Sequence, residues 1–300
     1  MRALARLFAS DVRYGLLCEA LPRLAVVAAV SGLVFFLSYT TVLIQVPGLG
    51  GRLTFGEGVL CMFRGMLPYV PESGKPFQFP MAWLALLVSM AYVAADYPLR
   101  DLGGMGARMI VASGSRWAWW LSKCAWAIVC AFVCCAIPLA MCALATLVTG
   151  GDWSVAIRPG VATVLRSGEA STLAAGAGVD TSQLVLDVEG QALVGIGAAV
   201  AVLPLSLAAI LLVQMLASLL VHPVVGLMTS VAVLFFSAYF RFRWLPGEYL
   251  MLARTDALMR GGMHPWQGAL LGLGIIVAAV LAGGLLFARR DILGRGGEGR

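Results

Sequence analysis

The chain has 300 residues, of which 61% are hydrophobic and 12% are charged, and its formal net charge is +6. A soluble globular domain carries about 25% charged residues, so the composition excludes an ordinary soluble protein. Apolar runs near 20 residues cross a bilayer as helices, and the runs here are too long to be barrel strands. The sequence therefore predicts an all-α integral membrane protein in which residues 1–300 form a single transmembrane domain.

The first 22 residues have the pattern of an amphipathic helix. Apolar side chains fall on one face of residues 1–22, and Arg2, Arg6 and Arg13 fall on another, while Asp11 interrupts the edge between them. Such a helix lies in the membrane interface, with its arginines near the lipid headgroups. The apolar run that follows is too long for a signal peptide and has no convincing cleavage site.

Six apolar runs follow along the chain. They predict six transmembrane helices at residues 24–46, 77–95, 119–148, 192–221, 224–240 and 267–287. The second is the weakest, since its clean apolar core is short. Polar or Gly- and Pro-rich loops connect the spans at residues 47–76, 150–190 and 241–266, and the middle of the last loop is a candidate for a short interfacial or re-entrant helix.

The distribution of Lys and Arg predicts the orientation. With both termini in the cytoplasm, the inner segments contain twelve Lys and Arg against six acids, and the outer loops contain nine against nine. This asymmetry agrees with the positive-inside rule, although the loop at 241–266 is rich in arginine. Arg outnumbers Lys by 19 to 2, and Ala and Gly are abundant, which suggests a GC-rich bacterial genome. We therefore expect a multi-pass protein of the bacterial cytoplasmic membrane, with residues 47–76, 150–190 and 241–266 extracytoplasmic.

The segment between the second and third spans, residues 96–118, is the only long internal polar stretch that this topology places in the cytoplasm. Apolar residues run through it at roughly helical spacing, although three glycines at 103, 104 and 106 weaken a helix there. We interpret it as a short helix on the membrane surface that is presented to another protein. The alternative is an ordinary cytoplasmic loop whose arginines only fix the orientation. At the start of the third span, Trp117, Trp119 and Trp120 beside Lys123 indicate an interfacial aromatic belt with a snorkelling amine.

Patterns for catalysis and for cofactors are missing from the sequence. It has no Walker A motif and no H-E-x-x-H motif, and its two histidines, His222 and His264, both stand beside prolines. Cys130 and Cys134 share a helix face without His or acidic partners, so packing is favoured over metal binding. The spans lack central Asp and Glu, which disfavours an ion-coupled secondary transporter. We expect no enzymatic activity, no catalytic or metal site, no bound cofactor and no nucleic-acid partner.

Taken together, the layout resembles the permease subunit of a type-2 ATP-binding-cassette exporter. At the level of residues the resemblance is concentrated in 108–116 (RMIVASGSR) with 119–123 (WWLSK), which is similar to the segment after the coupling helix, and in 287–292 (FARRDI), which is similar to the end of the last span. It implies that 99–109 is a coupling helix, braced by the N-terminal helix, that docks into a separate cytoplasmic ATPase. The implied docking residues are Leu99, Arg100, Asp101, Leu102, Met105, Arg108 and Met109.

The same resemblance implies that ATP and Mg bind to the partner ATPase rather than to this chain. It also implies a second permease subunit, identical or different, because one six-span chain supplies half of a pathway. Two other functions stay open: a secondary transporter or channel, and a membrane-embedded binding or immunity protein. An association with a Walker-motif ATPase distinguishes the first hypothesis from both.

Overall fold

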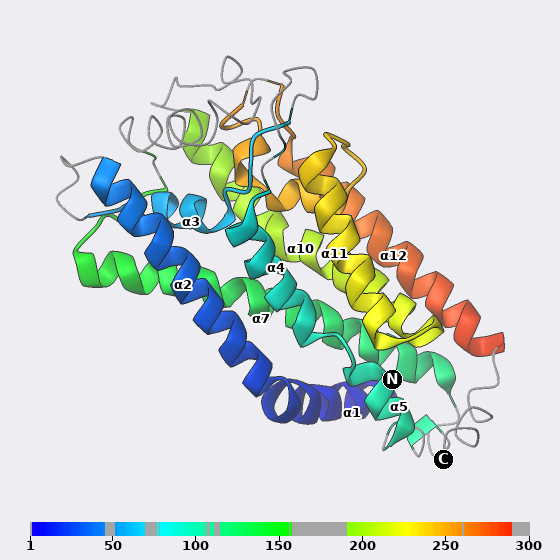
Figure 1. The fold of residues 1–300 in the computed structure, drawn as a ribbon. Helices are drawn as coiled ribbons and strands as arrows, with labels where there is room; N and C mark the ends of the chain where they lie inside the picture. The colour runs from blue at the N-terminus through cyan, green and yellow to red at the C-terminus, as the bar shows by residue number, and fades with distance from the viewer. Residues whose placement is uncertain are drawn as a thin grey trace.

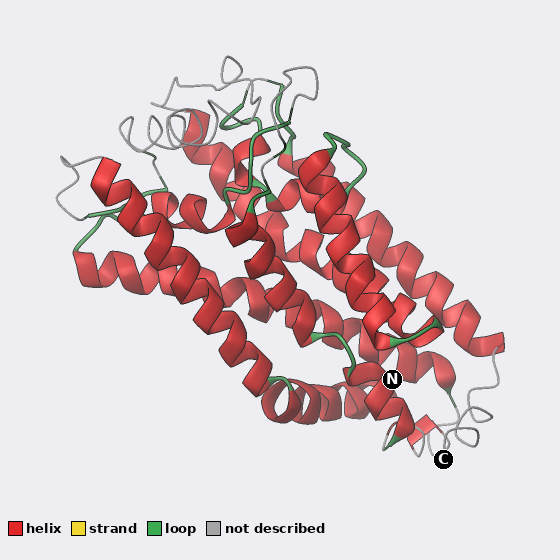
Figure 2. Cartoon of the chain, in the orientation of Figure 1, coloured by secondary structure: helices red, strands yellow, loops and turns green. Residues whose placement is uncertain are grey.

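Helices make up the regular structure of this protein (Figure 2). The computed structural model describes residues 2–45, 52–69, 77, 79–104, 106, 109–110, 115–155, 157, 191–259 and 261–289. Within these ranges no strand is formed, and the β-type contacts are isolated bridge residues, such as the bridge between Thr255 and Met263. The all-α prediction is therefore confirmed for the described part of the chain.

In the part of the chain that the structure describes, five helical segments are long and apolar enough to cross a membrane, which makes this a multi-pass membrane protein. They are Leu21–Ile44, Met81–Gly103, Arg116–Thr149, Ile196–Leu220 and Pro265–Phe287. The corresponding helices are α2 (Leu21–Gln45), α4 (Met81–Val93), α7 (Arg116–Thr149), α10 (Gln191–Leu220) and α12 (Pro265–Arg289). The fifth predicted span corresponds to α11 (Pro223–Tyr239), an apolar helix of 17 residues. A sixth membrane crossing therefore stays a prediction.

Helix α10 is at the centre of the helical assembly and packs against α7, α11 and α12 (Figure 1). The turn at His222 joins it directly to α11, in which Pro223 is the first residue and needs no backbone N–H partner. The hairpin is tight because Gly226 meets α10 without a side chain. A Cβ at Gly226 would lie 1.9 Å from Ser218 Oγ and 2.6 Å from the carbonyl oxygen of Gln214.

Helix α4 ends sooner than a full span requires, and polar side chains of other helices compensate. Its 13 residues extend about 20 Å at 1.5 Å per residue. The last carbonyl groups of any helix lack partners within it. Here Gln214 Nε2 donates to the carbonyl of Ala91 at 2.8 Å, and Ser218 Oγ donates to that of Ala95 at 3.3 Å. The Arg23 guanidinium reaches two further carbonyl groups at 3.4 and 3.5 Å.

The N-terminal segment consists of two helical parts at the lower end of the molecule in Figure 1. α1 (Arg2–Ser10) continues into η1 (Asp11–Glu19), which is wound as a π-helix and ends with a bond from Ala20 N–H to the carbonyl of Gly15 at 3.0 Å. Gly15 is required there because a Cβ would lie 2.4 Å from the ring of Tyr97. π-Helical turns are uncommon and frequently occur at functional sites. The predicted interfacial location of this segment stays a prediction.

A short buried helix, α3 (Phe55–Phe63), lies inside the stretch predicted as a loop at 47–76. Thr54 accepts a hydrogen bond from the Glu57 N–H at 3.2 Å, and Glu57 Oε2 accepts one from the Thr54 N–H at 2.9 Å. This capping box satisfies two donors that the helix start would leave unpaired. The sequence T-F-G-E carries that signal, but the high Gly and Pro content around it favoured a loop.

The predicted loop at 241–266 folds onto the same end of the bundle. It forms two short 3-10 helices, η6 (Pro246–Leu250) and η7 (Leu252–Arg254), whose residues are buried. Trp83 Nε1 of α4 donates to the carbonyl of Leu250 at 3.0 Å. The short helix expected at 249–259 is therefore replaced by 3-10 turns between Pro246 and Arg254, and residues 255–259 form turns and bridges. Most of the predicted loop at 150–190 falls outside the described residues.

Candidate functional site: the charged cluster at α5

The predicted docking segment begins with a helix of seven residues, α5 (Tyr97–Gly103). Pro98 occupies its first turn, where proline is tolerated because no intrahelical N–H partner is needed there. The helix ends at Gly103, and Gly104 follows in a non-helical conformation. The glycines therefore interrupt the predicted coupling helix of 99–109 at Gly104, and residues 106, 109 and 110 are again helical.

Lys123 of α7 lies between two carboxylates that come from different elements. Its Nζ pairs with Asp11 Oδ1 of η1 and, at 2.7 Å, with Asp101 Oδ2 of α5. The Lys123 side chain is 1% exposed, and the carboxylates are 8% and 14% exposed. Burying an ammonium is costly unless it is paired and hydrogen-bonded. One buried cation therefore joins three segments that are far apart in sequence.

Neutral donors and aromatic rings complete this arrangement. Asp11 accepts hydrogen bonds from Tyr97 Oη at 2.9 Å and from Ser122 Oγ at 2.5 Å, and Asp101 accepts one from Trp119 Nε1 at 3.0 Å. The Lys123 ammonium lies 4.5 Å from the ring centroid of Tyr97 and 5.5 Å from that of Trp119. The rings favour a cation electrostatically and exclude water. We refer to Asp11, Tyr97, Asp101, Trp119, Ser122 and Lys123 as the lysine cluster.

A second set of ion pairs holds the other side of α5. Asp96 pairs with Arg23 of α2 and, through Oδ2, with Arg100 Nε at 3.2 Å. Arg100 Nη2 also pairs with Glu19 Oε2 of η1 at 3.0 Å. These groups are more exposed than the lysine cluster, so each pair contributes less to stability. Together the two sets attach α5 to η1, α2 and α7.

The predicted docking residues differ in their exposure and in their contacts. Asp101 faces inward to Lys123, and Arg100 is exposed while bridging to Glu19. Leu99, Leu102 and Met109 are half-buried, and Leu102 packs against the hydrophobic core. Met105 and Arg108 fall outside the described residues, as does the side chain of Arg2. The other two predicted interfacial arginines, Arg6 and Arg13, are exposed.

The interpretation of Lys123 as a snorkelling interfacial amine is wrong. Lys123, Trp119 and Trp120 are all at most 1% exposed, and only Trp117 is as open as an interfacial residue, at 36%. Sequence reasoning also treated Asp11 as a flaw in an amphipathic pattern, whereas it is a central member of the cluster. Two signals pointed to it: an acid on the boundary between the apolar and basic faces of the N-terminal segment, and one of only two lysines in an arginine-rich chain.

The charged groups of this site hold η1, α5 and α7 together. Its carboxylates and its ammonium have partners and are closed to solvent, so the cluster holds elements in register. Elsewhere in the described residues, no group of three or more His, Cys, Asp or Glu could hold a metal ion. Cys130 and Cys134 are fully buried in α7.

The fold and this site together define a class: a multi-pass helical membrane protein with a short polar helix attached by ion pairs to one end of its bundle. In comparisons with known proteins, no family model, curated protein or solved structure matches the chain. The function must therefore be argued from the molecule itself.

Proposed function

We propose that this protein is the membrane-spanning permease subunit of an ATP-driven exporter, powered by a separate cytoplasmic ATPase that docks on α5. The observation that carries the proposal is the attachment of α5. A helix of seven residues that merely connected two spans would need no buried cation, yet α5 is held through Asp101 to Lys123 and through Asp96 to Arg23. A force applied to α5 would therefore reach α2, α7 and η1 together.

The distribution of buried charge favours an energy source outside the membrane helices. The charged residues that are buried within the described ranges lie near the two ends of the bundle: Asp11, Glu57, Lys123, Glu248 and Arg254. Ion-coupled carriers place ionisable groups near the membrane centre, where function offsets their cost in lipid. Between α10 and α11, the buried polar pair is neutral: Ser230 Oγ donates to Gln214 Oε1 at 2.6 Å.

The exposed part of α5 offers a clean test of docking. Gly103 is exposed and a Cβ there would meet nothing within 4 Å, so a side chain at this position starts in open space. We would purify the protein from native membranes as wild type, as Gly103→Arg and as the matched control Gly103→Ala. Identification of co-purifying proteins and an ATP-hydrolysis assay give the readout.

We expect an ATPase to accompany the wild type and the Gly103→Ala protein and to be lost from the Gly103→Arg protein. An ATPase that stays bound to the Gly103→Arg protein would place its docking surface elsewhere. If no ATPase accompanies the wild type, the permease hypothesis fails. Transport that survives ATP depletion but collapses with the proton gradient would then identify a secondary transporter.

A further inference from the structure

A strip of alternating aromatic and basic residues leaves the end of α11 that lies opposite α1 and α5. Residues 240–244 read Phe-Arg-Phe-Arg-Trp, and all five are exposed. Phe240, Phe242 and Trp244 are 50%, 53% and 71% exposed. Large aromatic side chains are enriched where membrane proteins meet the headgroup region, since their rings accommodate both apolar and polar surroundings.

The backbone of this strip is fixed from inside the protein. The N–H of Phe242 donates to Glu248 Oε1 at 3.2 Å, and the carbonyl of Arg243 accepts from Tyr249 Oη at 3.1 Å. Arg241 Nη2 donates to the carbonyl of Gly261 at 2.7 Å. The strip therefore presents its side chains from a held backbone, and binding a ligand there requires little ordering of the chain.

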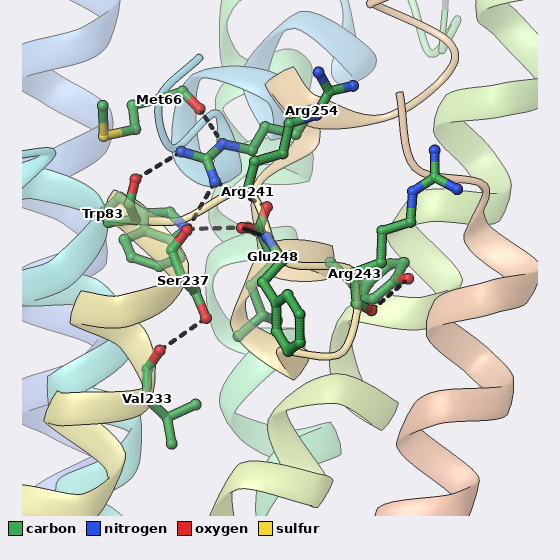
Figure 3. A network of polar contacts seen from close by, with 12 residues as sticks. Met66, Trp83, Val233, Ser237, Arg241, Arg243, Glu248 and Arg254 are labelled. Atoms are coloured by element: carbon green, nitrogen blue, oxygen red, sulfur yellow. Dashed lines mark hydrogen bonds and ion pairs between the residues drawn. The ribbon is translucent and has the colours of Figure 1, made fainter. Parts of the chain in front are cut away.

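The anchor beneath the strip is a buried ion pair (Figure 3). Arg254 Nη1 pairs with Glu248 Oε2 at 2.8 Å and donates to the carbonyl of Ser237 at 2.7 Å. Its other nitrogens donate to the carbonyls of Ala238 at 2.7 Å and Met66 at 2.9 Å. Arg254 thus caps the last carbonyl groups of α11, and its charge is neutralised by Glu248.

Two other arginines of the same loop remain exposed. Residues 241–266 contain four arginines and two acids. In the described part of this loop, the ion pairs are Glu248 with Arg254 and Asp256 with His264, and neither includes Arg241 or Arg243. Figure 3 shows the Arg243 side chain directed away from the buried pair. The positive-inside rule gives no reason for such charges on the face predicted to be extracytoplasmic.

We propose that residues 240–244 bind the headgroup of an anionic phospholipid in the leaflet at this end of the bundle. The guanidinium groups of Arg241 and Arg243 provide planar donors that match phosphate oxygens. The aromatic rings of the strip extend alongside the glycerol and upper acyl region. This inference does not depend on the proposed transport function, because it rests on exposure, charge and anchoring alone.

The test places the full chain in nanodiscs that contain a photoactivatable phosphatidylglycerol or the matching phosphatidylcholine. Adducts are mapped to peptides by mass spectrometry. A basic residue near an anionic surface contributes about fivefold in affinity, so for two arginines we expect phosphatidylglycerol to label residues 240–244 about 25-fold more than phosphatidylcholine at low salt. High salt should reduce this preference, because exposed charges are screened.

The variants are Arg243→Gln and the double variant Arg241→Gln/Arg243→Gln. The single variant keeps the bond from Arg241 to Gly261, so loss of preference in it cannot be attributed to loop unfolding. We expect about a fivefold fall in preference for the single variant and near loss for the double variant. Labelling near the exposed Arg13, at the other end of the bundle, is the internal control. Equal labelling by both lipids, or phosphatidylglycerol labelling unchanged in Arg243→Gln, would overturn the proposal.

Discussion

Replacing Lys123 by Met tests whether the lysine cluster joins three segments through one buried cation. The unbranched side chain keeps most of the volume and removes the charge. Asp11 and Asp101 would then stay buried at 8% and 14% exposure without their shared cation, although each keeps at least one neutral donor. Removing one partner of a buried pair costs about 3–5 kcal/mol, so we expect an unfolding free energy lower by about that amount.

Neutralising both carboxylates as well distinguishes the loss of charge pairing from a general packing defect. The variant Asp11→Asn/Asp101→Asn/Lys123→Met has no buried charge in the cluster, and we expect it to recover most of the lost stability. Asp101→Asn alone should cost less, about 1.5–3 kcal/mol, since Lys123 keeps Asp11 as a partner. Reversible unfolding in detergent micelles, followed by circular dichroism, gives the free energies.

Two results would contradict a joining role for the Lys123 cation: an unfolding free energy of Lys123→Met within about 1 kcal/mol of the wild type, or a triple variant as unstable as the single one. The first result would mean that the cation contributes little net energy in this environment. The second would mean that packing around the alkyl chain, rather than charge, dominates the site.

Three further substitutions have expected outcomes. Burial raises the pKa of Glu248, and Arg254 opposes that rise, so Arg254→Gln should raise this pKa further. A raised pKa of Glu248 adds stability only while its carboxyl group is protonated. We therefore expect the free energy of unfolding of the variant to fall more steeply than that of the wild type as pH rises above about 4.5. Unfolding titrations from pH 4 to 8 measure this difference. Thr54→Ala removes the N-terminal cap of α3 and should lower the free energy of unfolding by about 1 kcal/mol in the same assay. An unchanged free energy would show that α3 is held by packing alone. Gln214→Leu leaves the buried hydroxyl of Ser230 without its acceptor and should cost about 1–3 kcal/mol, whereas adding Ser230→Ala should restore part of that loss.

The long apolar helices could be predicted closely from the sequence. The structure places α2, α7, α10 and α12 within three residues of the predicted ends, because an uninterrupted apolar run has one stable conformation in lipid. Helix α4 was less certain for a physical reason that the structure makes visible. Its apolar run is short, and side chains of other helices supply the partners that its end lacks.

The lysine cluster could be located only in part. The docking segment was recognised as special from its charge and position, and Asp101 was among its predicted residues. The partner of Lys123 was missed because Asp11 lies 112 residues away along the chain, and no periodic pattern encodes that pairing. The buried α3 was missed because composition favoured a loop, although its capping box stood in the sequence.

The short length of α4 has a consequence for biogenesis. The carbonyl group of Ala95, just beyond its last residue, is satisfied by Ser218, which is synthesised 123 residues later. At about 5–20 residues per second, roughly 6–25 seconds separate the two during translation. During that interval α4 would stay near the membrane surface or beside the insertion machinery, because an unpaired carbonyl group is costly in lipid. Its final depth in the membrane would therefore be set only when α10 arrives, late in synthesis.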